Sequence, residues 1–233
     1  MLPDDELHVW RAGLDLTEEE LAPLACLLSS DERSRAAQFH FERDRRRFTA
    51  GRGVLRSILA TYIGCAADEV KFDYGVRGKP GLAGASLQFN LAHSEGLVVI
   101  GLSCSGRLGV DVERIRPLAD ILEIASCCFS PRERQAIAVL PPEDRLLGFF
   151  TCWIRKEAYL KATGDGIATA LDSFEVPVTP GSPPKLLNME GVPNEVARWS
   201  FSDLPLDADY LGVVAYEGKI KRLRHLVWQS PEV

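Results

Sequence analysis

The sequence predicts an α+β protein built from two related halves that join near residues 104–108. The first half has a long helical segment followed by short strand-like segments, and the second half repeats the order of helix and then strands. Residue identity between the halves is low, so the order of elements is the indication of a repeat. We therefore expect an N-terminal half over residues 1–106 and a C-terminal half over residues 107–233, with a site in the cleft between them.

The first half contains one predicted long helix. Over residues 31–62, apolar side chains recur at spacings of three and four, the period of an amphipathic helix. Ser30 is the expected N-cap, and Gly64 follows the last turn. Short apolar or alternating segments bounded by Gly, Pro or Ser then indicate strands at residues 70–75, 86–92 and 97–103.

The second half opens on a predicted strand at residues 108–113. Two helical segments follow, one at 118–138 with a break at Ser130-Pro131, and one at 143–163. Gly164 and Gly166 come after the second helix and suit a left-handed cap. Further strand-like segments complete this half at residues 173–178, 197–203, 210–217 and 223–228.

Composition is that of a globular protein. The chain has 233 residues, 46% of them hydrophobic, and a net charge of −6, which argues against general nucleic-acid binding. No apolar run approaches the roughly 20 residues that span a bilayer, and the acidic N-terminus is unlike a secretory signal. We expect a soluble, cytoplasmic protein that binds neither membrane nor nucleic acid. The six cysteines lack metal-ligand spacing, which predicts reduced and mostly buried thiols.

Residues 31–56 form a basic segment within this acidic chain, with eight arginines against four acids. One interpretation is a solvated helix face. The other is a patch that binds a phosphorylated ligand or an acidic partner, because guanidinium groups pair well with phosphate and carboxylate.

Two carboxylates stand in the apolar strand that opens the second half. Asp111 and Glu113 are two residues apart, so their side chains point to the same face, while Val110 and Val112 point to the other. Two nearby negative charges on a half-buried strand repel each other and are costly to desolvate. The pattern therefore predicts a cation beside them.

A third carboxylate lies on the helix predicted at residues 143–163. Trp153, Glu157 and Lys161 are spaced by four and share one face. By itself, the Glu/Lys spacing is typical of a surface ion pair. Together with Asp111 and Glu113, it favours a site for a hard cation such as magnesium, which commonly clamps a diphosphate.

Two turns supply groups that a phosphate ligand would need. Arg77 and Lys79 lie in the turn "RGKPG", and His93 and Ser94 follow a strand in "FNLAHSEG". A lone His is more often structural than functional. Here the small residues around His93 leave room for a ligand, so both interpretations stay open.

Together, these motifs resemble those of the Sfp-type 4′-phosphopantetheinyl transferase family, over essentially the whole chain. The G-(I/V)-D-(I/V)-E strand of the family reads Gly109-Val110-Asp111-Val112-Glu113. Its W-x-x-K-E-(A/S)-x-x-K helix reads Trp153-Ile154-Arg155-Lys156-Glu157-Ala158-Tyr159-Leu160-Lys161. The upstream G-K-P and N-x-(S/A)-H-S elements occur at residues 78–80 and 90–94.

The resemblance implies a fold of two pseudo-symmetric α/β halves with the active site between them, and the activity of a holo-(acyl-carrier-protein) synthase. Coenzyme A and magnesium, or manganese in its place, would bind. A serine of an apo acyl or peptidyl carrier protein would attack the β-phosphorus, and adenosine 3′,5′-bisphosphate would leave. Such carriers serve fatty acid, polyketide and nonribosomal peptide biosynthesis.

Site residues follow from the motif match. Asp111, Glu113 and Glu157 would hold the metal. Glu157 would also act as the base, with Lys161 and His93 completing the catalytic set. The residues implied in coenzyme A binding are Arg47, Arg35, Lys79, Ala92, His93, Lys156 and Lys161.

Three positions depart from the family pattern. Ala92 replaces a common Ser, Glu95 stands where a smaller residue is common, and Glu32 stands where we expect a basic residue. None of these removes a metal ligand.

Two other functions stay open: a magnesium-dependent hydrolase of nucleotide diphosphates or coenzyme A, and a non-catalytic module that binds carrier proteins. Paired halves in one chain favour a monomer, although the sequence does not exclude a dimer.

Overall fold

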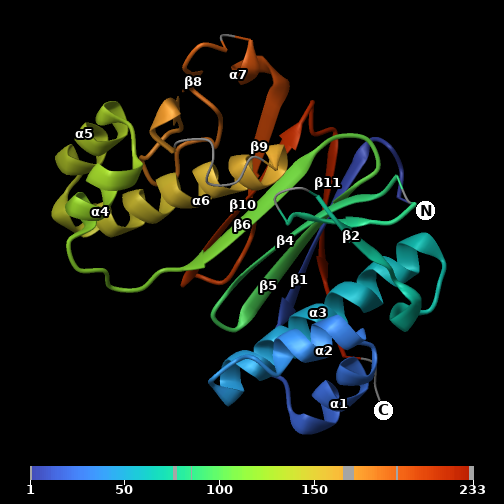
Figure 1. Ribbon diagram of the computed structural model, residues 1–233. Helices are drawn as coiled ribbons and strands as arrows, with labels where there is room; N and C mark the ends of the chain where they lie inside the picture. The colour runs from blue at the N-terminus through green and yellow to red at the C-terminus, as the bar shows by residue number, and fades with distance from the viewer. Residues whose placement is uncertain (1, 76–77, 85, 165–170, 193, 231–233) are drawn as a thin grey trace.

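The computed structural model describes residues 2–75, 78–84, 86–164, 171–192 and 194–230 (Figure 1). The predicted turn residue Arg77 and the predicted cap residue Gly166 lie outside these ranges. The helices are α1 (Glu18–Cys26), α2 (Ser30–Ala36), α3 (Glu42–Ile63), α4 (Ile121–Cys128), α5 (Pro131–Val139), α6 (Arg145–Thr163) and α7 (Glu195–Arg198). The strands are β1 (Glu6–Gly13), β2 (Phe72–Tyr74), β3 (Pro80–Leu82), β4 (Gln88–Ser94), β5 (Leu97–Ser103), β6 (Leu108–Arg114), β7 (Phe174–Glu175), β8 (Asn188–Met189), β9 (Trp199–Asp203), β10 (Tyr210–Glu217) and β11 (Arg222–Val227).

Two main sheets organise the molecule, which confirms the predicted α+β class. The first has the strand order β11-β1-β5-β4, and the second has the order β6-β10-β9. Helices α1, α2 and α3 lie beside the first sheet, and α6 runs along the second (Figure 1). Each main sheet therefore buries an apolar face against its own long helix.

The two sheets meet where β4 lies beside β6. The backbone N–H of Val110 donates to Oδ1 of Asn90 at 2.8 Å, and the N–H of Arg114 donates to Oγ of Ser94 at 3.1 Å. These bonds join β4 to the strand that carries the acids. Between the sheets, an apolar cluster includes Ala92 and Val112.

The helix predicted over residues 31–62 is two helices in the structure. A capping box starts α2, with Ser29 as the N-cap in place of the predicted Ser30. The buried Glu32 then pairs with Arg52 and Arg56 of α3, and this contact requires α2 to fold back along α3. The helix end was predicted correctly, because Gly64 caps α3 in the left-handed conformation, at φ 72°.

The sequence interpretation missed one central strand and misplaced another. Residues 6–13 form β1, which pairs with both β5 and β11. The segment predicted at 223–228 forms β11, which joins the first sheet parallel to β1 instead of the second sheet. The last strand therefore crosses back to the first half.

Two other expectations concern thiols and membranes. All six cysteines are free, but only Cys152 is buried, so the prediction of mostly buried thiols was wrong. Among the helices of the described ranges, none is both long and apolar enough to cross a membrane.

Candidate active site

The predicted acids lie where α6 packs closely on β6. This close approach depends on Gly109, because a Cβ at that position would lie 2.1 Å from the carbonyl oxygen of Ala158. Along β6, Val110 and Val112 point into the apolar cluster. The alternate face of the strand, which carries Asp111, is thereby brought to α6.

Asp111 is 4% exposed and pairs with the α6 lysine. The Nζ of Lys161 donates to Oδ1 at 2.6 Å, whereas Oδ2 is buried without a hydrogen-bond partner among the described residues. Burial raises the pKa of Asp111 to about 7, Lys161 opposes this rise, and Glu113 and Glu157 add to it. A buried carboxylate with an unpartnered oxygen is a place where a further positive charge would be stabilising.

Glu113 and Glu157 complete the acidic set. The Oγ of Ser94 donates to Oε2 of Glu113 at 2.7 Å, which fixes this carboxylate at the end of β4. Burial raises the pKa of Glu157, Lys161 lowers it, and Glu113 raises it. Lys161 and Glu113 are therefore close enough to shift the pKa values of both Asp111 and Glu157.

The chemistry of these side chains suits a hard divalent cation. Across the part of the chain that the structure describes, no three His, Cys, Asp or Glu side chains already form a metal-binding cluster. However, the acids offer oxygen ligands, Oδ2 of Asp111 lacks a partner, and the acids repel one another. A cation held by these oxygens would relieve that repulsion.

His93 and Ala92 are neighbours on β4 with opposite environments. His93 is exposed to solvent. Desolvation by the surrounding protein still lowers its pKa, Lys161 lowers it further, and Glu113 acts in the opposite direction. Ala92 is 3% exposed and belongs to the apolar cluster between the sheets, so its methyl group lies away from solvent.

Lys79 bridges the two halves of the chain. Its Nζ donates to the carbonyl oxygen of Lys161 at 2.6 Å, at the C-terminal end of α6, where a positive charge is favourable. Burial lowers the pKa of Lys79 to about 8, and the charge of Arg107 contributes. Lys79 and Arg107 line a cleft of about 1020 Å³, together with Phe89 and Gly164. Lys79 thus links this cleft to the backbone of Lys161, whose side chain pairs with Asp111.

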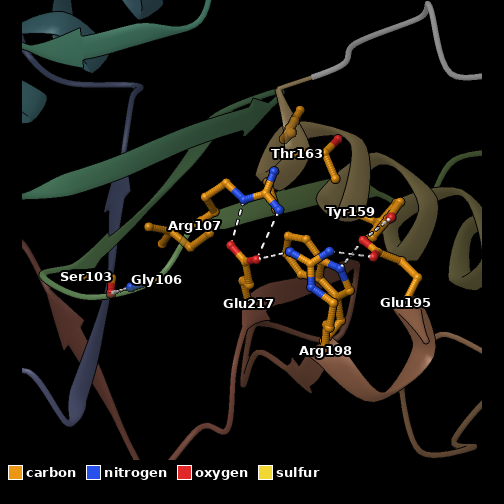
Figure 2. Close-up of polar contacts among 12 residues, drawn as sticks. Ser103, Gly106, Arg107, Tyr159, Thr163, Glu195, Arg198 and Glu217 are labelled. Carbon is orange, nitrogen blue, oxygen red and sulfur yellow. Dashed lines mark hydrogen bonds and ion pairs between the residues drawn. The ribbon is translucent and has the colours of Figure 1, made fainter. Parts of the chain in front are cut away.

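Arg107, which lines this cleft, begins a series of ion pairs between side chains of alternating charge (Figure 2). The sequence analysis did not predict this series. Arg107 donates from Nε and Nη2 to the carboxylate of Glu217 at 2.6 and 3.1 Å. Arg198 donates to the same carboxylate and also to Glu195, which accepts from the hydroxyl of Tyr159 on α6. Arg107 and Glu217 are 110 positions apart, so no local pattern could have revealed the pair.

The basic segment divides into structural and accessible arginines. Arg52 and Arg56 pair with the buried Glu32, so the acid at this departure from the family pattern serves the core. Arg35 is exposed, with its guanidinium 5.7 Å from the centre of the Phe48 ring. Arg47 is partly buried and paired with two carboxylates.

Lys156 lies in the core, and this placement corrects our expectation that it contacts a ligand. Its side chain is fully buried, and its Nζ lies 2.8 Å from Oε2 of Glu133. It also donates to the carbonyl oxygens of Leu171 and Phe174. With its ammonium group satisfied inside the protein, Lys156 ties α6 to α5 and to residues 171–174.

Comparisons with known proteins match both halves of the chain. Residues 107–214 match the profile of the 4′-phosphopantetheinyl transferase superfamily, and residues 14–105 match the profile described as 4′-phosphopantetheinyl transferase, N-terminal.

Individual relatives share this similarity over most of their length. The chain is 45% identical over 221 residues to the 4′-phosphopantetheinyl transferase HetI of Nostoc sp., covering 93% of this chain and 90% of that protein. It is 35% identical to the putative 4′-phosphopantetheinyl transferase slr0495 of Synechocystis sp., covering 90% and 83%. Identity to the 4′-phosphopantetheinyl transferase Sfp of Bacillus subtilis is 27%, covering 69% and 71%. This chain therefore belongs to the 4′-phosphopantetheinyl transferase superfamily, a family of transferase enzymes.

Proposed function

We propose that this protein transfers the 4′-phosphopantetheine arm of coenzyme A to a serine of an apo acyl or peptidyl carrier protein, with magnesium or manganese. One structural observation supports this proposal in addition to the family membership. Asp111 of β6 and Lys161 of α6 are in direct contact, and Glu113 and Glu157 are close enough to raise the pKa of Asp111. The two motifs, far apart in sequence, therefore build one site.

In the proposed reaction, the serine oxygen forms a bond to the β-phosphorus of coenzyme A. The bond between that phosphorus and the bridging oxygen breaks, and adenosine 3′,5′-bisphosphate takes the electron pair. The cation would be held by Asp111, Glu113 and Glu157, and when bound it neutralises charge on the phosphoryl oxygens. Lys161 brings a further positive charge to the same phosphates.

Glu157 accepts the proton of the serine hydroxyl. Its pKa is raised by burial, which makes the carboxylate a stronger base than an exposed glutamate. His93 has a lowered pKa and is therefore neutral at pH 7, so one ring nitrogen can donate a hydrogen bond to a phosphate oxygen.

The nucleotide end of coenzyme A would lie toward the first half. Lys79 lines the cleft and approaches the adenosine, and Arg47 and Arg35 supply positive charge for the 3′-phosphate. Ala92 can contribute its backbone but no side-chain hydrogen bond. Because both halves of the site belong to one chain, we also infer a monomer, which light scattering would test.

The first test is the intact mass of several apo carrier proteins after incubation with the enzyme, coenzyme A and magnesium, with and without EDTA. We expect a gain of one phosphopantetheinyl group that EDTA abolishes. Consumption of coenzyme A without a mass gain would instead support the hydrolase. Carrier binding without any consumption would support the non-catalytic module.

A matched pair of variants tests the acids. We expect Asp111→Asn to lower the rate of transfer by about a hundredfold or more while the protein stays folded, because the site loses a buried negative charge. Asp209→Asn removes an exposed carboxylate that pairs with Arg114 and should leave the rate unchanged. An Asp111→Asn enzyme as active as the unmutated protein would exclude this metal assignment.

A further inference from the structure

Arg47 is held by two carboxylates from different segments. Its Nε and Nη2 donate to the two oxygens of Asp15 at 2.7 and 2.9 Å. Its Nη1 donates to Oε2 of Glu95 at 2.9 Å. The side chain of Arg47 is 17% exposed, and all three guanidinium nitrogens donate to these two carboxylates. Any anion that binds Arg47 must therefore compete with a carboxylate already in place.

Asp15 is the fixed partner of the two. It binds Arg47 through both oxygens, and this bidentate geometry is the stronger arrangement for a guanidinium–carboxylate pair. It also packs directly on the turn between β4 and β5, because a Cβ at Gly96 would lie 2.4 Å from its Oδ2. The neighbouring Leu14 N–H donates to the carbonyl oxygen of Gly96 at 2.8 Å, which anchors this segment.

Glu95 is the partner that can leave. It makes one hydrogen bond to Arg47, whereas Asp15 makes two, although the Asp15 side chain is the more exposed of the two, at 59% against 35%. Its backbone has φ 48°, in the left-handed region that glycine adopts more easily than other residues. The turn itself therefore gives no reason for glutamate at position 95, whereas the contact with Arg47 does.

The charges around Glu95 keep it ionised. The hydrogen bond from Arg47 lowers the pKa of Glu95, and Arg43 and Arg114 lower it further. At neutral pH, position 95 therefore presents a carboxylate to Arg47. A phosphate dianion carries more charge than a carboxylate and offers more acceptor oxygens, so it can exchange with Glu95 while Asp15 keeps Arg47 oriented.

We propose that Glu95 competes with the 3′-phosphate of coenzyme A for Arg47 and so sets the affinity of the site for this donor. This inference rests on the proposed function, in which Arg47 binds that phosphate. Glu95 weakens the binding of coenzyme A, because its ion pair with Arg47 must open first.

The test compares coenzyme A with 3′-dephospho-coenzyme A as donors for the same carrier, in the unmutated enzyme, Glu95→Gln and Glu95→Gly. We expect both variants to lower KM for coenzyme A about two- to fivefold, the effect of losing one partly exposed ion pair. We expect kcat to stay the same. KM for 3′-dephospho-coenzyme A should not change, because this donor lacks the 3′-phosphate that competes with Glu95 for Arg47.

Glu18→Gln is the matched control. Glu18 pairs with Arg46, the neighbour of Arg47 on α3, so the variant removes one negative charge nearby without touching Arg47. Its KM for both donors should equal that of the unmutated enzyme. An unchanged or raised KM for coenzyme A in both Glu95 variants would overturn the inference, since Glu95 would then orient Arg47 instead of competing.

A binding titration separates this inference from the proposed function. Calorimetry with adenosine 3′,5′-bisphosphate needs neither a carrier nor turnover. Tighter binding to Glu95→Gly than to the unmutated protein would support competition at Arg47, even if no transfer were found with any carrier. Equal affinities would overturn it.

Discussion

Lys156 and Glu157 are adjacent in α6, yet their side chains lie in opposite environments. Lys156 is fully buried beside Glu133, at 2.8 Å, and Glu133 also accepts hydrogen bonds from the backbone N–H groups of Ser130 and Val176. Glu157 lies among the acids of the candidate site. The motif thus places one charged residue in the core, where it fixes the helix, and its neighbour in the proposed site.

The buried pair predicts a large loss of stability when it is broken. We expect Lys156→Met to lower the free energy of unfolding by about 3 to 5 kcal/mol, because Glu133 is left buried without its counter-charge. Urea denaturation measures this, with the exposed Lys185→Met as control. Adding Glu133→Leu should recover part of the loss, and a Lys156→Met protein of unchanged stability would contradict the pairing.

Glu217 predicts a pH dependence of stability. Its hydrogen bonds with Arg107 and Arg198 lower its pKa to about 2, from an ordinary value of 4.5. A lowered pKa in the folded state means that the stabilisation is complete above pH 4.5 and is lost as the pH falls toward 2. We expect Glu217→Gln to cost about 1 to 2 kcal/mol at pH 7, after allowance for solvent screening.

Urea denaturation of both proteins at several pH values checks this result. The difference between Glu217→Gln and the unmutated protein should shrink between pH 4.5 and pH 2. A difference that stays constant over this range would show that Glu217 contributes by packing and not by charge.

At the scale of elements, the packing of α6 on β6 decides whether the site exists. Gly109 is the glycine of the strand motif, and α6 lies so close that a side chain at this position would overlap the backbone at Ala158 and Ala162. The motif glycine therefore sets the separation between the strand that carries Asp111 and the helix that carries Glu157 and Lys161.

We expect Gly109→Ala to lower the free energy of unfolding by about 1 to 3 kcal/mol, because the added methyl group meets backbone that cannot move aside without shifting the helix. Gly13→Ala is the control, since a Cβ there has open space within 4 Å. Thermal denaturation compares the two variants. Equal melting temperatures would mean that α6 can shift away from β6 at little cost.

At the scale of the whole molecule, the two halves depend on each other. The last strand, β11, pairs with β1 of the first sheet, and β4 of the first sheet bonds with β6 of the second. Lys79 adds a bridge to the end of α6. The boundary that we propose between the two halves, after residue 106, is therefore not a boundary between independently folding units.

This arrangement predicts that residues 1–106 expressed by themselves will not unfold cooperatively. The fragment would expose the edge of β1 that β11 covers and the edge of β4 that faces β6. Circular dichroism during heating measures this, with the full chain as control. A sharp, reversible transition in the fragment would show that the first half folds without its partner.

Local sequence patterns predicted many elements well. Strands β5 and β10 follow the predicted segments, Gly64 and Gly164 end the long helices as expected, and Ser130 starts α5. These features depend on neighbours in the chain, which a sequence displays directly. The same holds for the alternation along β6 that places Asp111 and Glu113 on one face.

The sequence by itself determined the α+β class, the spacing of the acids and the family to which the motifs point. Tertiary structure decided the rest: that Lys156 turns into the core, that β11 returns to the first sheet, and that Glu95 covers Arg47. Each of these depends on contacts between residues far apart in the chain. Such contacts set burial and charge pairing, and no local period or motif encodes them.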